Sequence, residues 1–164
     1  MSKIISNLPK FDENKLGQIF QNCCDVITQN KPEKYEAEMI LDAIKVEWKK
    51  RSSSNSYSKK RPTVGMLGFL GYKVGQEGES KKRRHFILQF VINEQLPFVQ
   101  SPMYVREWGD PKTKKRYLKT ANVIKSFISK YTNFKQPGFE KALIEWEEDL
   151  EYLRKLYRDQ FNKK

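Results

Sequence analysis

The residues best suited to chemistry in this chain are positively charged, and they gather in three groups at residues 49–61, 81–84 and 112–119. The chain has 32 Lys and Arg against 20 Asp and Glu, a formal net charge of +12. A positive field of this size attracts polyanions, so nucleic acid is the first partner to consider. The side chains that we expect to contact it are Lys59, Lys60, Arg61, Lys81, Lys82, Arg83, Arg84, Lys112, Lys114, Lys115, Arg116 and Lys119.

Two of these groups fall in the first turns of expected helices. There the helix macrodipole disfavours cations, so cations in that position suggest an anionic ligand. We expect residues 81–84 and 112–119 to form one continuous basic surface. Such contacts hold the sugar–phosphate backbone without reading its sequence, and they leave open whether the nucleic acid is DNA or RNA.

Residues suited to catalysis are sparse. His85 is the one histidine of the chain, it follows four cations, and the sequence beside it offers no carboxylate to orient its ring. Cys23 and Cys24 are adjacent, so we expect reduced, small apolar residues rather than metal ligands. We therefore expect a protein that is not an enzyme and that uses no metal or cofactor. A magnesium-dependent nuclease with Glu107 and Asp110 as ligands is the alternative.

The elements that must position these residues are helices. Apolar residues recur at three- and four-residue steps, and no alternating strand pattern of any length appears. Helices are expected over residues 12–30, 33–50, 64–70, 81–95, 101–108 and 112–131 and from residue 139 onward, with Asp12 and Thr63 as N-caps and Asn30, Gly71 and Gly109 as stops. This pattern predicts an all-α fold of six or seven helices.

The chain is expected to divide into a helical hairpin at residues 1–50, a basic serine-rich linker at 51–62, and a basic helical domain at 63–164. A hairpin this short buries little apolar surface alone. Its apolar stripe, which includes Ile40, Ile44 and Trp48, therefore predicts a homodimer built as a four-helix bundle. The alternative is that the hairpin folds back on residues 64–157.

The last expected helix carries an acidic patch that includes Glu147, Glu148 and Glu151. Exposed ion pairs with the chain's own lysines would contribute only about 0 to 1 kcal/mol each, too little to account for so dense a patch by stability. We expect these three residues to face a basic partner protein.

The chain also resembles a known kind of protein. It contains LGFLGYKVG, KRRHFIL, YVREWGDPKTKKRYLKTANVI and ALIEWEEDLEYLRKLY in that order. This series resembles a module of bacterial immunity proteins that accompanies nucleases, and the small, lysine-rich chain is similar to the pro-CRISPR accessory factors that bind a type II CRISPR effector nuclease. The resemblance implies a non-catalytic, homodimeric or partner-bound role in antiviral defence, and it supplies no site residue.

The sequence thus predicts a DNA- or RNA-binding accessory protein, with a protein-only adaptor as a further alternative. Nowhere do 18 apolar residues run together. We expect a cytoplasmic protein with no membrane span.

Overall fold

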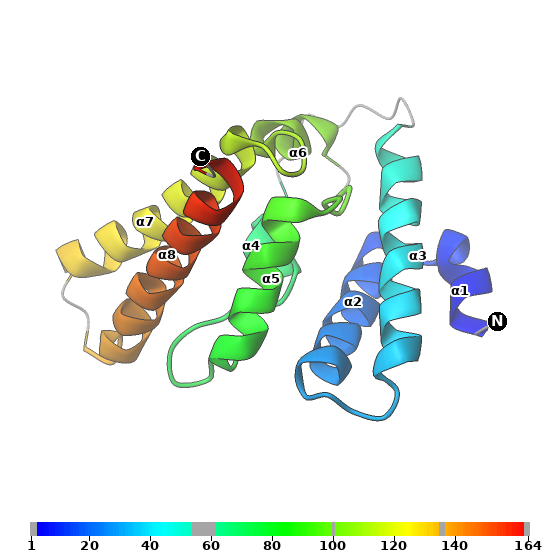
Figure 1. The fold of residues 1–164 in the computed structure, drawn as a ribbon, viewed down its shortest axis with the longest axis horizontal. Coiled ribbons are helices and arrows are strands. Elements are labelled where there is room, and N and C mark those ends of the chain that lie inside the picture. Colours follow the sequence, from blue (N-terminus) through cyan, green and yellow to red (C-terminus); the bar gives the residue numbers. More distant parts are fainter. Residues whose placement is uncertain (1–2, 54–61, 100, 135–136, 163–164) are drawn as a thin grey trace. The chain divides into compact units, whose positions relative to one another are not determined.

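The structure, a computed structural model, describes residues 3–53, 62–99, 101–134 and 137–162. These residues are helical and contain no strand, which confirms the all-α prediction. The elements in chain order are α1 (Lys3–Asn7), the 3₁₀-helix η1 (Leu8–Lys10), α2 (Glu13–Thr28), α3 (Lys34–Ser52), α4 (Met66–Phe69), α5 (Lys81–Asn93), α6 (Pro102–Trp108), α7 (Lys114–Phe134) and α8 (Glu140–Phe161) (Figure 1). The sequence pattern missed α1, which buries none of its residues, and the short η1 that follows it.

The chain forms two compact units. Unit 1 comprises Met1–Gly71 and Glu94–Glu107, and unit 2 comprises Tyr72–Asn93 and Trp108–Lys164. This grouping differs from the expected division, because residues 63–71 and 94–107 associate with the N-terminal helices rather than with the rest of 63–164. Most of the expected linker, residues 54–61, lies outside the described residues.

Unit 1 is built on the antiparallel helices α2 and α3 (Figure 1). The side chain of Asp12 caps α2 by accepting a hydrogen bond of 2.7 Å from the backbone N–H of Lys15, as expected. Asn30 follows the helix with a φ of 53°, a left-handed conformation that Asn tolerates better than most residues. Arg51 then closes the unit by donating to the carboxylate of Glu13 at 2.8 Å and to the backbone of η1.

The apolar stripe of α3 is used inside unit 1. Ile44 and Trp48 have no exposed surface, Ile40 is 6 % exposed, and the Trp48 ring lies 5.7 Å from the ring of Phe20 on α2. These side chains are core residues, so the predicted partner interface through Ile40, Ile44 and Trp48 is wrong. The stripe is buried because α2, α1 and η1 cover α3 within the same unit.

A short irregular segment completes unit 1. The expected N-cap of α4 was Thr63, but the N-cap is Gly65, which has no side chain to accept a hydrogen bond. The stop at Gly71 is confirmed by its φ of 85°. The backbone of α4 is fixed instead from outside, because the Tyr104 hydroxyl accepts a hydrogen bond of 3.0 Å from Met66 N–H.

Unit 2 consists of α5, α7 and α8, with α7 and α8 packed side by side (Figure 1). Its core includes Ile87 and Val91 of α5, Ile124 of α7 and Leu153 of α8, all fully buried. The amide N–H of Lys112 donates a hydrogen bond of 2.8 Å to the carbonyl of Ile92, so the C-terminal end of α5 meets the start of α7. The N-terminal end of α5 meets α8 instead.

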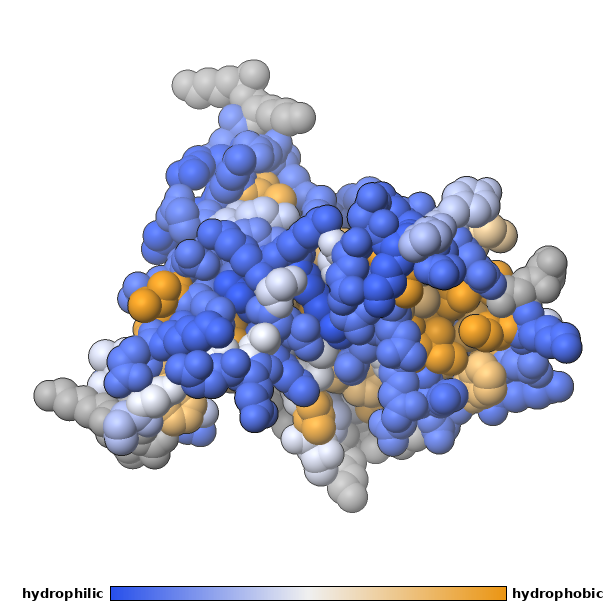
Figure 2. Space-filling view, turned by 90° about the horizontal axis from the view of Figure 1, so that it is seen from below, coloured by the Kyte–Doolittle hydropathy of each residue, from blue (hydrophilic) through white to orange (hydrophobic). Residues whose placement is uncertain are grey.

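The exposed surface agrees with a mean hydropathy of −0.79. Most atoms on the face drawn in Figure 2 belong to hydrophilic residues, with hydrophobic residues exposed between them. No helix in the described ranges combines the length and the apolar character needed to cross a membrane.

Candidate functional site

A buried carboxylate, Asp149, organises the N-terminal end of α5. Asp149 has no exposed surface, and its Oδ2 accepts hydrogen bonds of 2.6 Å from the Tyr72 hydroxyl and 2.9 Å from Arg84 Nε. Tyr72 reaches this position directly after the left-handed turn at Gly71. Burial, followed by the charge of Asp149, raises the pKa of Tyr72, so the phenol stays protonated and serves as a donor.

Arg84 is the counter-charge of this carboxylate. Its side chain is 2 % exposed. Its guanidinium also lies 3.2 Å from Glu145 Oε1 and donates a hydrogen bond of 2.9 Å to the carbonyl of Glu79. Burial lowers the pKa of Arg84, but the hydrogen bond and charge of Asp149 outweigh it, and the pKa is raised overall. A buried ion pair with this many hydrogen bonds satisfies the charges that the fold has removed from water.

His85 lies on the other side of Asp149. Its Nε2 is 3.1 Å from Asp149 Oδ1, although the ring N–H is not directed well enough at that oxygen to form a hydrogen bond of good geometry. The imidazole stacks on Tyr152, with ring centres 3.8 Å apart. Burial, together with the charges of Lys81 and Arg84, lowers the pKa of His85 against the opposing effect of Asp149. The imidazole is therefore neutral at pH 7.

The expectation that His85 lacks a carboxylate beside it is therefore wrong. Asp149 lies on α8, far from His85 in the sequence, so no local sequence pattern predicts the pairing of these two residues. The carboxylate is already shared by Arg84 and Tyr72, which makes it the centre of a charge-balanced network. What this arrangement can do is hold α5, α8 and the segment before α5 together.

The three arginines of the expected basic surface that the structure describes are buried. Arg83 is 7 % exposed and pairs with Glu79 at 3.3 Å, while Arg84 and Arg116 are each 2 % exposed. Arg116 donates from Nη1 to the carbonyl of Val91 at 2.8 Å and from Nε to the carbonyls of Trp108 and Gly109 at 3.2 and 3.0 Å. The prediction that these three arginines contact nucleic acid is corrected, because their guanidinium groups are committed inside unit 2.

Arg116 differs from Arg84 because carbonyl oxygens surround it. Burial lowers the pKa of Arg116 to about 10, with a smaller opposing effect of Asp110. The group is still charged at pH 7, and backbone carbonyls stabilise it, with a smaller contribution from the charge of Asp110.

The lysines of the expected surface remain outside, but in two separate places. Lys81 pairs with Glu148 at 3.3 Å, and Lys82 is exposed with no ion pair to the described residues. These two lie at one end of α5, whereas the lysines that begin α7 lie at its other end, about 16 Å away at about 1.5 Å per residue. The prediction of one continuous surface is therefore wrong. Lys59, Lys60 and Arg61 lie outside the described residues.

Among the residues that the structure describes, the strongest cationic feature is the solvent face of α7. Lys112, just before the helix, and Lys114 and Lys115 in its first turn are exposed. Lys119 is partly exposed, with its ammonium 5.9 Å from the Trp108 ring centre. Lys125 and Lys130, which were not singled out from the sequence, are exposed farther along the same helix. The 21-residue sequence of α7 contains no Asp or Glu.

The acidic patch of α8 is partly used by the fold. Glu148 approaches Lys81 and Arg84, and Glu151 pairs with Arg154 at 3.1 Å. Glu147 is exposed and forms no ion pair with the described residues. Part of the patch therefore serves the fold itself, because Glu145, Glu148 and Asp149 together neutralise a buried arginine.

The described residues do not form a set of metal ligands for the alternative, a magnesium-dependent nuclease. No group of three or more His, Cys, Asp or Glu side chains in the described part of the chain could hold a metal ion. Glu107 ends the segment assigned to unit 1, and Asp110 lies in the turn that precedes α7 in unit 2.

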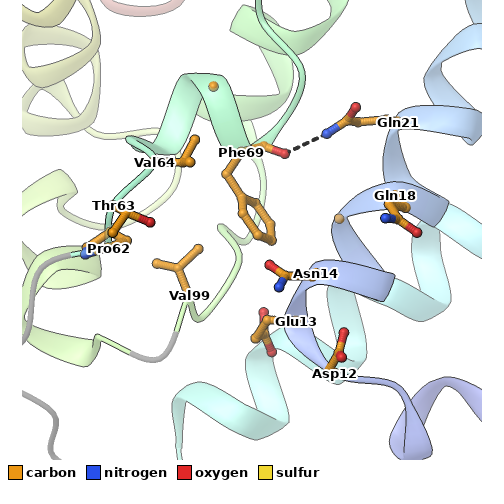
Figure 3. A pocket seen from close by; sticks show the side chains of 12 residues that line it. Asp12, Glu13, Asn14, Gln18, Gln21, Pro62, Thr63, Val64, Phe69 and Val99 are labelled. Atoms are coloured by element: carbon orange, nitrogen blue, oxygen red, sulfur yellow. Dashed lines mark hydrogen bonds between the residues drawn. The ribbon is translucent and has the colours of Figure 1, made fainter.

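A cleft of about 590 Å³ lies within unit 1 (Figure 3). Gly17 allows its floor to form, because a Cβ there would lie 2.8 Å from the Phe69 ring. Gln21 donates a hydrogen bond of 2.9 Å to the carbonyl of Phe69 (Figure 3). Carboxylates and amides line it, from Asp12, Glu13, Asn14, Gln18 and Gln21, and no lysine or arginine is among the described residues at its wall.

Sequence reasoning missed Tyr72, Asp149, Lys125 and Lys130, and a signal existed for three of them. Asp149 falls at helical spacing with the buried Trp146 and Leu153. Lys125 follows Lys114, and Lys130 follows Lys119, by about three helical turns at about 3.6 residues per turn, so each lies on the same side of the helix as the earlier lysine.

No protein-family model, curated protein or solved structure matches the chain.

Proposed function

We propose that the chain binds the sugar–phosphate backbone of a nucleic acid, without catalysis, through the exposed lysines of α7. One observation carries this proposal. The solvent face of α7 presents five lysines, and the sequence of the helix itself contains no Asp or Glu. Lysine side chains that neutralise phosphates release counterions, which is the main source of affinity in backbone binding.

The position of the first lysines on the helix supports the same conclusion. Lys114 and Lys115 occupy the first turn of α7, where the macrodipole makes a cation unfavourable. Neither Lys114 nor Lys125 forms an ion pair with the described residues, so the described part of the chain offers no compensation for those two charges. An anionic polymer compensates them, and the net charge of +12 attracts it over long range.

Fluorescence anisotropy with labelled DNA or RNA of random sequence tests the proposal. Lys114→Gln, Lys125→Gln and Lys130→Gln should each weaken binding, and each lost contact should lower the slope of log K against log salt by roughly 0.9 on duplex DNA. The matched controls are Lys141→Gln and Lys155→Gln, which remove the same charge from exposed positions on α8. Equal effects of both sets would show that net charge acts without a defined face.

Incubation of the complex with Mg²⁺ separates the other candidate functions. Binding without cleavage supports the proposal. Cleavage of the labelled strand would favour the nuclease, and the absence of both would favour a protein-only adaptor. The accessory role beside a CRISPR nuclease, and a homodimer, stay predictions from the resemblance and from the sequence pattern.

A further inference from the structure

The exposed face of α7 has an internal order that plain backbone binding does not require. At about 100° per residue, Lys114 and Lys125 project within about 20° of each other, and so do Lys119 and Lys130. The two pairs form two rows that run along the helix about 140° apart. Lys115, Leu118, Asn122 and Ser129 project between the rows, and all four are exposed.

This order fits the shape of a nucleic-acid groove. An α-helix with its side chains is about 10–12 Å wide, and the major groove of B-form DNA is about 12 Å wide. The groove is bordered on each side by a row of phosphates, and its floor presents the hydrogen-bonding edges of the bases. Two outer rows of cations, with Asn122 and Ser129 between them as uncharged donors and acceptors, therefore match the groove side by side, and Lys115 adds one further cation near the N-terminal end of the strip.

The length of the face also fits. Lys114 and Lys130 are about 24 Å apart along the helix at about 1.5 Å per residue. Duplex DNA carries one negative charge per about 1.7 Å of its axis, so a face of this length can meet several phosphates on each strand.

We infer that α7 lies in the major groove of duplex DNA, with its two lysine rows on the bordering phosphates and with Asn122 and Ser129 facing the bases. This inference rests on the proposed function and narrows it to one nucleic acid. The major groove of an A-form RNA duplex is too deep and narrow for side chains to read, so duplex RNA should not be accepted in the same way.

The test compares four duplexes of one sequence with the full chain. The first is unmodified DNA, and the second carries glucosylated hydroxymethylcytosine, which fills the major groove and leaves the phosphates in place. The third is DNA whose minor groove is saturated with distamycin, and the fourth is RNA. Binding should fall by about tenfold or more on the glucosylated DNA and on the RNA, and it should hold on the distamycin-treated DNA, because about 1–3 kcal/mol of contact is lost in the blocked groove.

A pair of variants places the contact on the chain. Asn122→Glu puts a negative charge between the lysine rows, and Gln89→Glu makes the same change at an exposed position on α5. Both sites are on the surface, so neither change should unfold the protein. Asn122→Glu should weaken binding to unmodified DNA at least tenfold, and Gln89→Glu should change it less than about threefold.

The outcomes separate the two proposals. Salt-dependent binding that is equal on all four duplexes and lost in the lysine variants would overturn the groove assignment and leave backbone binding intact. Equal effects of Asn122→Glu and Gln89→Glu would also overturn it. The absence of binding to every duplex and to single strands would overturn the proposed function itself.

Discussion

A buried arginine holds each end of α5, but the two are stabilised in different ways. At the N-terminal end, the carboxylates of Asp149 and Glu145 neutralise Arg84. At the C-terminal end, Arg116 of α7 is held by the carbonyls of Val91, Trp108 and Gly109. Both side chains are 2 % exposed, so burial does not distinguish them.

The difference appears in their proton affinity. The pKa of Arg84 is raised because Asp149 outweighs the cost of burial, whereas burial lowers the pKa of Arg116 to about 10. A charge therefore needs partners when it is buried, and either a carboxylate or a set of aligned carbonyls suffices. The carboxylate can be removed by one substitution, but the carbonyls cannot, and this contrast can be tested.

The largest effect is expected at the Arg84 end. Arg84→Met leaves the fully buried Asp149 without its cation, which typically costs about 3–5 kcal/mol of the free energy of unfolding. Chemical denaturation measures the loss, and hydrogen exchange of peptides from α5 and α8 assigns it to unit 2.

The control at this end is the double variant Arg84→Met with Asp149→Asn, which removes both charges and keeps an acceptor for Tyr72. It should recover much of the lost free energy of unfolding, because paired neutral groups carry no unpaired charge. A double variant no more stable than Arg84→Met would contradict the assignment of Asp149 as the partner.

The second effect is expected at the Arg116 end. Arg116→Lys replaces a planar fork by a single ammonium that cannot reach Val91 and Gly109 together. We expect a loss of about 2–3 kcal/mol, the scale of charge-assisted hydrogen bonds. Hydrogen exchange should become faster at Lys112, whose N–H bonds to the end of α5. Unchanged exchange there would show that Arg116 does not fix this junction.

A smaller effect is expected at the glycine beside Arg116. Gly109 has a φ of 77°, and a Cβ there would lie 2.9 Å from Lys115 Cδ. Gly109→Ala should cost about 1–2 kcal/mol from the left-handed backbone. Gly138→Ala is the matched control, since Gly138 has a φ of 89° and nothing within 4 Å of an added Cβ. Thermal unfolding of both variants separates backbone strain, which they share, from the contact with Lys115.

The smallest effect is expected from pH, and only at the Arg84 end. The pKa of His85 lies below its usual value of 6.5, chiefly because of burial. Below pH 6.5 the unfolded chain therefore binds a proton that the folded chain does not, and the free energy of unfolding falls as the pH falls. His85→Gln should flatten this dependence in denaturation measured from pH 7 to pH 5. A steeper dependence in the variant would mean that the folded pKa is raised.

Much of the fold could be predicted because it is local. The apolar spacing of α2, α3, α5 and α7 and the cap of α2 at Asp12 are local features of the sequence, and the observed ends fall close to the expected ones. The division into units could not be predicted, because it depends on contacts such as that of Gln21 with Phe69 O and the close approach of Gly17 to the Phe69 ring. A linear pattern does not report such contacts.

The candidate site was harder to predict than the helices, because its contacts also join residues that are distant in the sequence. Arg83 and Arg84 follow two lysines, so the run has the composition of a solvated basic patch. Arg84 stands one and two helical turns before the buried Ile87, Leu88 and Val91, which places it on the apolar face. That signal indicates burial, but it does not identify the partner, because Asp149 is 65 positions away.

The separation of Tyr72 from Asp149 has a consequence for how the chain is made. The two residues are 77 positions apart, and Arg84 and His85 lie near the first of them. During synthesis α5 leaves the ribosome well before the carboxylate that neutralises it, so its cation and its apolar side chains must wait unpaired. Unit 2 can therefore reach its native packing only after residues through Asp149 have emerged. If translation paused before that point, α5 would remain exposed, with Arg84 not neutralised and with apolar side chains that could bind other proteins.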